Sequence, residues 1–253
     1  MTTLMLNRND VYTGNLVLVN AKHPLVSEKN IDLISVDENH LNILMERGAA
    51  TVLSNILDDI NCTDKIVPVS GYRSKEEQEQ IYRDSLKENG TEFTKKYVAF
   101  PQCSEHQTGY AIDLGLKKDV IDFIRPDFPY DGICDKFRKI APTYGFIERY
   151  QRGKEIITGI AHEPWHFRFV GYPHSEIMME KGLSLEEYIE DIKQYPYDGE
   201  HLKIIRGKGT IEIFHAPVLS YKQITLNMPD HCICQVSGNN VDGIIITLWR
   251  QEE

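Results

Sequence analysis

The sequence lacks an excess of basic residues, long apolar runs and a paired set of cysteines. Its 253 residues include 28 Lys and Arg against 38 Asp and Glu, which gives a formal charge of -10. An acidic chain has no broad electrostatic attraction for nucleic acid or anionic lipid. We therefore expect neither nucleic acid nor a membrane among its partners, and expect a small substrate instead.

Three further features that the sequence lacks narrow the class of protein to which it can belong. No stretch approaches the roughly 20 apolar residues that a membrane-spanning helix needs. The amino terminus shows no basic segment followed by an apolar core, so we expect no secretory signal. The five cysteines are odd in number and scattered, which argues against a disulfide framework. These features predict a cytoplasmic protein in a reducing compartment.

Hydrophobic periodicity predicts a mixture of helices and strands. Apolar residues at helical spacing predict a helix over residues 37–60, and the run at residues 66–69 predicts a short strand. Ser74 and Glu77 match a capping box that would start the next helix. Arg73 therefore lies at a predicted strand-to-helix junction, where a side chain is well held and can face a cleft.

The pattern changes near residue 195. Beyond a connector that contains Pro and Gly, several short β-like runs follow one another, separated by turn residues. We predict a main domain over residues 1–194 and a β-rich C-terminal appendage over residues 195–253. The sequence contains no internal repeat that would indicate a solenoid.

Two short motifs contain the residue types of a metal site. They are SEHQTGYAID at residues 104–113 and EPWH at residues 163–166. His106, Asp113 and His166 would offer two imidazoles and a carboxylate. A catalytic zinc ion is usually held by three such ligands, with the fourth position left for water.

Glu163 and Arg73 would complete a hydrolytic centre. Glu163 is left free to act as a general base, which takes a proton from the attacking water and passes it to the leaving amine. Arg73 would meet the negative charge that develops on the attacked carbonyl oxygen. Each of these residues taken alone is more often structural, as a core histidine, a turn aspartate or a salt-bridge arginine. The full set in this order favours an enzyme.

The segment HEPWH at residues 162–166 formally matches the H-E-x-x-H pattern of helical zinc proteases. That pattern requires both histidines to lie one turn apart on the same helix. Pro164 would interrupt this turn, and the β-rich residues that follow indicate a strand. We therefore interpret His162 as a bystander.

Together with SGYRS at residues 70–74, the two motifs resemble the zinc D,D-peptidases of the VanX/VanY family, and most of all its VanXY type. The resemblance covers roughly residues 35–175. It implies an α+β fold of the hedgehog and D,D-peptidase kind, in which a small central antiparallel sheet is flanked by helices. The β-rich appendage lies outside it and has no assigned role.

The resemblance also implies a role for each site residue. One zinc ion per chain would be bound by His106, Asp113 and His166. Glu163 would be the base, and Arg73 the group that polarises the carbonyl. Ser104 would hold the amino end or backbone of the substrate, and Gln78 would help to place the substrate.

The implied substrates are small peptides that end in D-Ala-D-Ala. Hydrolysis of this dipeptide, or removal of the last D-Ala from peptidoglycan precursors, would deprive vancomycin of its target. Ser70 stands where dipeptidase-like members tend to carry an acidic residue, which leaves the balance between the two activities open. Two alternatives remain: a cell-wall lytic endopeptidase of the same superfamily, and a non-catalytic hedgehog-like zinc-binding module. The acidic charge argues against the first, and the presence of both Glu163 and Arg73 argues against the second.

Overall fold

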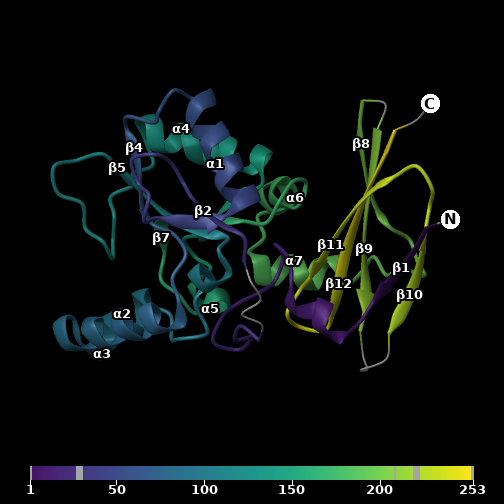
Figure 1. The fold of residues 1–253 in the computed structure, drawn as a ribbon, viewed down its shortest axis with the longest axis horizontal. Helices are drawn as coiled ribbons and strands as arrows, with labels where there is room; N and C mark the ends of the chain where they lie inside the picture. Colours follow the sequence, from purple (N-terminus) through teal and green to yellow (C-terminus); the bar gives the residue numbers. More distant parts are fainter. Residues whose placement is uncertain (1, 27–30, 208, 219–222, 252–253) are drawn as a thin grey trace. The chain divides into compact units, whose positions relative to one another are not determined.

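The computed structural model describes residues 2–26, 31–207, 209–218 and 223–251. The chain separates into two compact units, Val19–Ser184 and a second unit made of Met1–Leu18 with Leu185–Glu253 (Figure 1). No helix in these described ranges is long and apolar enough to cross a membrane.

The unit Val19–Ser184 is built on a four-stranded antiparallel sheet. Its strand order is β4-β5-β7-β6, and a short hairpin of β2 and β3 precedes it in the sequence. The strands are β2 (Leu33–Ser35), β3 (Leu44–Glu46), β4 (Ile66–Ser70), β5 (Ala111–Leu116), β6 (Phe146–Tyr150) and β7 (Glu163–Phe169). The helices are α1 (Arg47–Asp59), α2 (Lys75–Glu88), α3 (Gly90–Tyr97), α4 (Gly132–Ile140), α5 (Glu155–Thr158) and α6 (His174–Lys181).

The two faces of this sheet differ in chemistry. Successive side chains of a strand point to opposite faces, so Ile112 and Leu114 of β5 enter the apolar core while Asp113 points away from it. Leu53 of α1 and Phe137 of α4 belong to the same core. Figure 1 shows α1 and α4 together on one side of the sheet, with the pair α2 and α3 on the other side. The opposite face of the sheet, turned away from α1 and α4, carries polar side chains such as Asp113.

The predicted helix over residues 37–60 begins too early. Residues 44–46 form β3, because they pair with β2 in the hairpin, and α1 begins at Arg47. The Glu46 side chain accepts a hydrogen bond from the Ala49 backbone N–H at 3.0 Å and caps the helix. Apolar spacing over a few residues fits a strand as well as a helix, so it could not locate this boundary.

The second unit is β-rich. It contains a four-stranded sheet of order β11-β12-β9-β8, a two-stranded pair of β1 and β10, and one longer helix, α7. The elements are β1 (Thr2–Leu6), α7 (Leu185–Ile192), β8 (Leu202–Arg206), β9 (Gly209–Pro217), β10 (Ile224–Met228), β11 (Ile233–Gly238) and β12 (Gly243–Gln251). Phe214 and Ile246 lie in its core. The predicted α+β fold is confirmed, while the division into domains at residue 194 stays a prediction.

Candidate metal centre and active site

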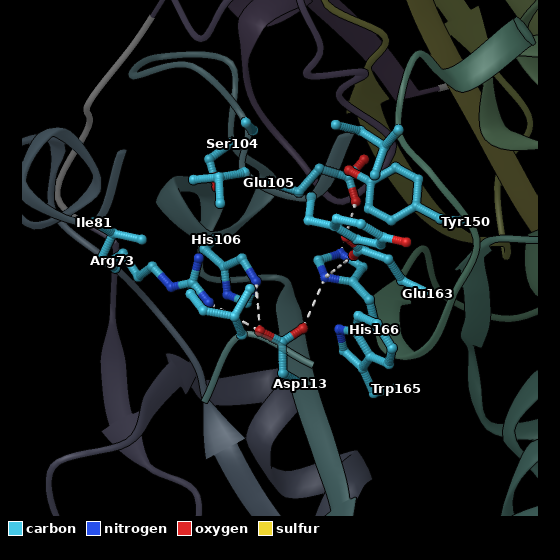
Figure 2. A pocket seen from close by; sticks show the side chains of 15 residues that line it. Arg73, Ile81, Ser104, Glu105, His106, Asp113, Tyr150, Glu163, Trp165 and His166 are labelled. Atoms are coloured by element: carbon cyan, nitrogen blue, oxygen red, sulfur yellow. Dashed lines mark hydrogen bonds and ion pairs between the residues drawn. The ribbon is translucent and has the colours of Figure 1, made fainter. Parts of the chain in front are cut away.

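His106, Asp113 and His166 converge at the centre of the polar face of the sheet (Figure 2). Asp113 on β5 lies directly opposite His166 on β7 in the antiparallel register. His106 comes from a short 3₁₀ helix, Glu105–Thr108, that leads into β5. All three side chains are buried, and each offers a ligand atom within 4.8 Å of the others.

Hydrogen bonds orient both imidazoles for metal binding. His106 Nδ1 lies 2.6 Å from the Gly71 carbonyl oxygen, to which it donates, so its Nε2 is left facing Asp113 Oδ2 at 3.2 Å. His166 turns its Nδ1 to Asp113 Oδ1 at 2.9 Å. Two imidazole nitrogens and a carboxylate, buried together, form a donor set that fits catalytic zinc. These residues could therefore hold the ion that the sequence predicts.

Glu163 lies beside this group without belonging to it. Its Oε2 is 3.9 Å from His166 Nδ1, and its side chain is buried in the wall of the same pocket. Burial raises the pKa of Glu163 to about 8, and the nearby negative charge of Asp113 adds to the rise. A carboxyl group with a pKa near the operating pH can both accept and return a proton, as a general base must.

Arg73 enters the site from the end of β4. The capping box that follows it is confirmed, since the Glu77 N–H donates to Ser74 Oγ at 3.1 Å and the Ser74 N–H to Glu77 Oε2 at 2.7 Å. The guanidinium donates to Ser70 Oγ and to Asp113 Oδ2, both at 2.9 Å. Arg73 is therefore fixed beside the predicted ligands.

The two predicted substrate-binding residues occupy different positions. Ser104 is buried in the wall of the pocket, which is partly open to solvent. Gln78 is fully buried and is not part of the lining. Its amide donates to the Ala99 carbonyl oxygen at 2.8 Å, and its Oε1 accepts from Arg73 Nη1 at 3.4 Å. Its contacts hold Arg73 in place, and direct contact with a substrate stays a prediction.

His162 lies outside the group of ligand atoms. Residues 163–169 form β7, so the prediction that Pro164 excludes a helix here is confirmed. The His162 ring stacks on Tyr130, and its Nε2 lies 2.7 Å from the Tyr130 hydroxyl and 3.6 Å from a Glu148 carboxylate oxygen. These contacts hold His162 away from the other two histidines.

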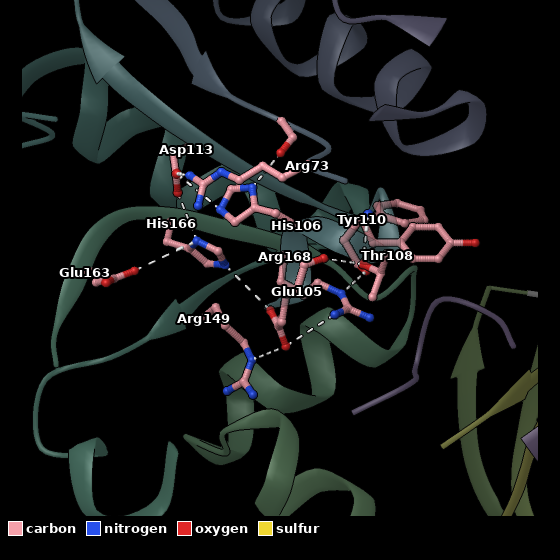
Figure 3. Close-up of polar contacts among 12 residues, drawn as sticks. Arg73, Glu105, His106, Thr108, Tyr110, Asp113, Arg149, Glu163, His166 and Arg168 are labelled. Carbon is pink, nitrogen blue, oxygen red and sulfur yellow. Dashed lines mark hydrogen bonds and ion pairs between the residues drawn. The ribbon is translucent and has the colours of Figure 1, made fainter. Parts of the chain in front are cut away.

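The sequence did not reveal a cluster of buried charged residues next to the predicted ligand His166. Glu105 is completely buried between Arg149 and Arg168 and lies next to His166 (Figure 3). Burial pushes the pKa of Glu105 upward, but the two arginines more than offset this and lower it below its ordinary value. A glutamate inside a motif looks like any surface residue in a single sequence, so no signal distinguished it.

The comparison with known families is consistent with this geometry. A family model described as VanY, D-alanyl-D-alanine carboxypeptidase, matches residues 42–172. The chain belongs to the VanY family. The bifunctional D-Ala-D-Ala dipeptidase and D-Ala-D-Ala carboxypeptidase VanXYC of Enterococcus gallinarum is 40% identical over 185 residues, which are 72% of this chain and 96% of that protein. The predicted membership of a D,D-peptidase family is thus confirmed.

Solved structures of similar proteins match all or part of this fold. The vancomycin resistance D,D-dipeptidase VanXYg, in complex with a D-Ala-D-Ala phosphinate analogue, is 54% identical with a TM-score of 0.96, and the match covers 98% of this chain and 99% of that one. A D,D-pentapeptidase VanY from a VanB-type resistance cassette, in complex with Zn(II), is 26% identical with a TM-score of 0.57, over 69% of this chain and 98% of that one.

Proposed function

We propose that this VanY-family protein is a zinc-dependent D,D-peptidase that contributes to vancomycin resistance. It would hydrolyse the dipeptide D-Ala-D-Ala, remove the C-terminal D-Ala from peptidoglycan precursor pentapeptides, or do both. The observation that carries the proposal is the buried group of His106, Asp113 and His166 with Glu163 beside it in one pocket. Relatives named for these activities support the choice of substrate.

One zinc ion per chain would be held by His106, Asp113 and His166. When bound, it would supply a Lewis acid that polarises the peptide carbonyl and makes water nucleophilic near neutral pH.

Glu163 and Arg73 would perform the steps that belong to the protein. Glu163 takes the proton of the attacking water and passes it to the nitrogen of the leaving D-Ala. The Arg73 guanidinium faces the carbonyl oxygen and stabilises the negative charge that develops there. Gln78 holds Arg73 in this position, and Ser104 offers a hydroxyl to the substrate backbone.

The pocket suits a substrate with small apolar side chains. Ile81, Ile124, Ile160 and Trp165 line it together with the polar residues. A methyl group fits such a wall, whereas the hydroxyl of D-Ala-D-Ser would lose hydrogen bonds to water on burial. We therefore assign a preference for D-Ala over D-Ser at the C-terminal position.

We also propose that the protein acts in the cytoplasm and that catalysis takes place in its main domain. All five cysteines are free thiols, which fits a reducing compartment. Every residue assigned a role here lies in the unit Val19–Ser184.

The test is a substrate panel with the purified, zinc-loaded chain. D-Ala-D-Ala, D-Ala-D-Ser and a pentapeptide precursor that ends in D-Ala-D-Ala are incubated separately, and released D-Ala or D-Ser is measured. We expect release from at least one substrate that ends in D-Ala-D-Ala, its loss with a chelator and its return when zinc is added back. Absence of release from both such substrates by zinc-loaded protein would refute the proposal.

A further inference from the structure

The imidazole of His166 lies between two carboxylates. Its Nδ1 lies 2.9 Å from Asp113 Oδ1, and its Nε2 lies 3.6 Å from Glu105 Oε2 on the other side. Within the described residues, neither His166 Nε2 nor Glu105 Oε2 has a hydrogen-bond partner, and both atoms are buried. A buried donor and a buried acceptor that face each other satisfy each other with a small approach. Glu105 is therefore placed to receive the N–H of His166.

Two arginines hold Glu105 in this orientation. Arg149 Nε donates to Glu105 Oε1 at 2.8 Å, and Arg168 Nη1 lies 3.3 Å from the same oxygen. Arg149 comes from β6 and Arg168 from the neighbouring β7, and both side chains are completely buried. Both arginines contact Oε1, which leaves Oε2 directed toward His166 (Figure 3).

Stability alone does not account for this cluster. Charged groups lose their hydration on burial, and replacement of a buried ion pair with apolar side chains is often neutral or stabilising. Glu105, Arg149 and Arg168 are all completely buried. The distinguishing feature of this cluster is its orientation, since the two arginines contact Glu105 Oε1 while Glu105 Oε2 faces His166, a predicted metal ligand.

We propose that Glu105, oriented by Arg149 and Arg168, is a positioning residue for His166. Its Oε2 accepts a hydrogen bond from the Nε2–H of His166, which fixes the ring orientation and the tautomer that keeps the Nδ1 lone pair available to zinc. Carboxylates in this position behind a metal-bound histidine strengthen metal binding. The inference rests on the proposed function, because that function assigns His166 as a ligand.

The experiment measures zinc affinity of the full chain by competition with a chromogenic chelator. Glu105→Ala removes both the charge and the acceptor, and Glu105→Gln keeps an acceptor of the same size without the charge. The matched control is Glu148→Gln. Glu148 is also a carboxylate paired with an arginine, Arg138, and its side chain is only 9% exposed. Its other charged or hydrogen-bonding side-chain partners among the described residues are Tyr130 and His162, which are not predicted ligands.

We expect Glu105→Ala to bind zinc about 10- to 100-fold more weakly than the unmodified chain, with Glu105→Gln in between. Glu148→Gln should stay within about twofold of it. Visible absorption of the cobalt(II)-loaded proteins reports ligand geometry, and its bands should change in Glu105→Gln but not in the control. Unchanged affinity and spectrum in Glu105→Gln, or equal changes in Glu148→Gln, would overturn the proposal. If Glu105→Ala does not fold, Glu105→Gln decides alone.

Zinc affinity is measured without substrate, so the two proposals can fail separately. If the unmodified chain releases no D-Ala while Glu105 variants lose zinc, the peptidase function fails and the positioning role stands. If the chain is an active peptidase and the variants bind zinc normally, only the positioning role fails. If the unmodified chain binds no zinc, both fail.

Discussion

Replacement of Glu163 by Gln isolates the proposed base from the proposed metal centre. Gln has nearly the same shape and can still form hydrogen bonds, but it cannot take up a proton from water. General base catalysis contributes roughly 10²- to 10⁴-fold. We therefore expect kcat of Glu163→Gln to fall by at least about 100-fold, which corresponds to about 2.7 kcal/mol of activation free energy.

The structure predicts that this variant keeps its metal and its fold. Glu163 Oε2 is 3.9 Å from His166 Nδ1 and is not among the ligand atoms that lie within 4.8 Å of one another.

Burial raises the pKa of Glu163 to about 8, above the ordinary value of 4.5. A carboxyl group of this kind stabilises the fold below pH 4.5 and loses this contribution as the pH rises through about 8. Gln does not ionise, so the metal-free variant should be at least as stable as the unmodified chain above pH 8.

Three measurements test this reasoning. They are the zinc content after dialysis, kcat with saturating D-Ala-D-Ala, and the thermal unfolding midpoint of the metal-free proteins at pH 8.5. Loss of zinc together with activity would show that Glu163 is a ligand and that its assigned role is wrong. A kcat within tenfold of the unmodified value, with full zinc content, would show that another group acts as the base.

Three further changes probe the site and the unit that contains it. Arg73→Ala should lower kcat about 10²- to 10³-fold with zinc content retained, because a charge-stabilising donor is lost; steady-state kinetics and metal analysis check this. Gly71→Ala would place a Cβ 2.3 Å from the Leu44 carbonyl oxygen, so the backbone that accepts the His106 hydrogen bond must move. Urea unfolding should show a loss of about 1–3 kcal/mol, and zinc affinity should fall as well. Burial lowers the pKa of His174 from its ordinary value of 6.5 to about 3. Between these two pH values the unfolded chain binds the proton and the folded chain does not. Stability should therefore fall with pH below 6.5 by about 1.4 kcal/mol per pH unit from this group, and His174→Gln should show a shallower fall in Tm than the unmodified chain.

Residue spacing predicted the parts of the site that depend on strand alternation. In the sequence, side-chain alternation along residues 109–116 puts Ile112 and Leu114 on one face and Asp113 on the other, and the core of the sheet has this arrangement. The junction at Arg73 followed from the capping box, which depends only on neighbouring residues. Such features are local, so a single sequence contains enough information to predict them.

Features that depend on tertiary pairing were not predictable in this way. The start of α1 at Arg47 reflects the pairing of β3 with β2, which apolar spacing alone cannot reveal. The burial of Glu105 depends on Arg149 and Arg168, which lie 44 and 63 positions further along the chain. The charge of these residues favours the surface in a sequence-based analysis. Only the approach of β6 and β7 to the 3₁₀ helix at Glu105–Thr108 places these charges together in the interior.

Glu163 and His166 show where a correct local prediction still falls short. Pro164 excludes a helix and the residues after it predict a strand, but residues three apart in a regular strand point to opposite faces, so a regular β7 would separate the base from the ligand. The observed β7 is irregular. Between the pairs Glu148–Phe167 and Tyr150–Glu163, it advances four residues while β6 advances two. A bulge of this kind redirects side chains, and both Glu163 and His166 line the pocket. The proline that excludes the helical zinc-protease arrangement thus lies within the irregularity that brings base and ligand together.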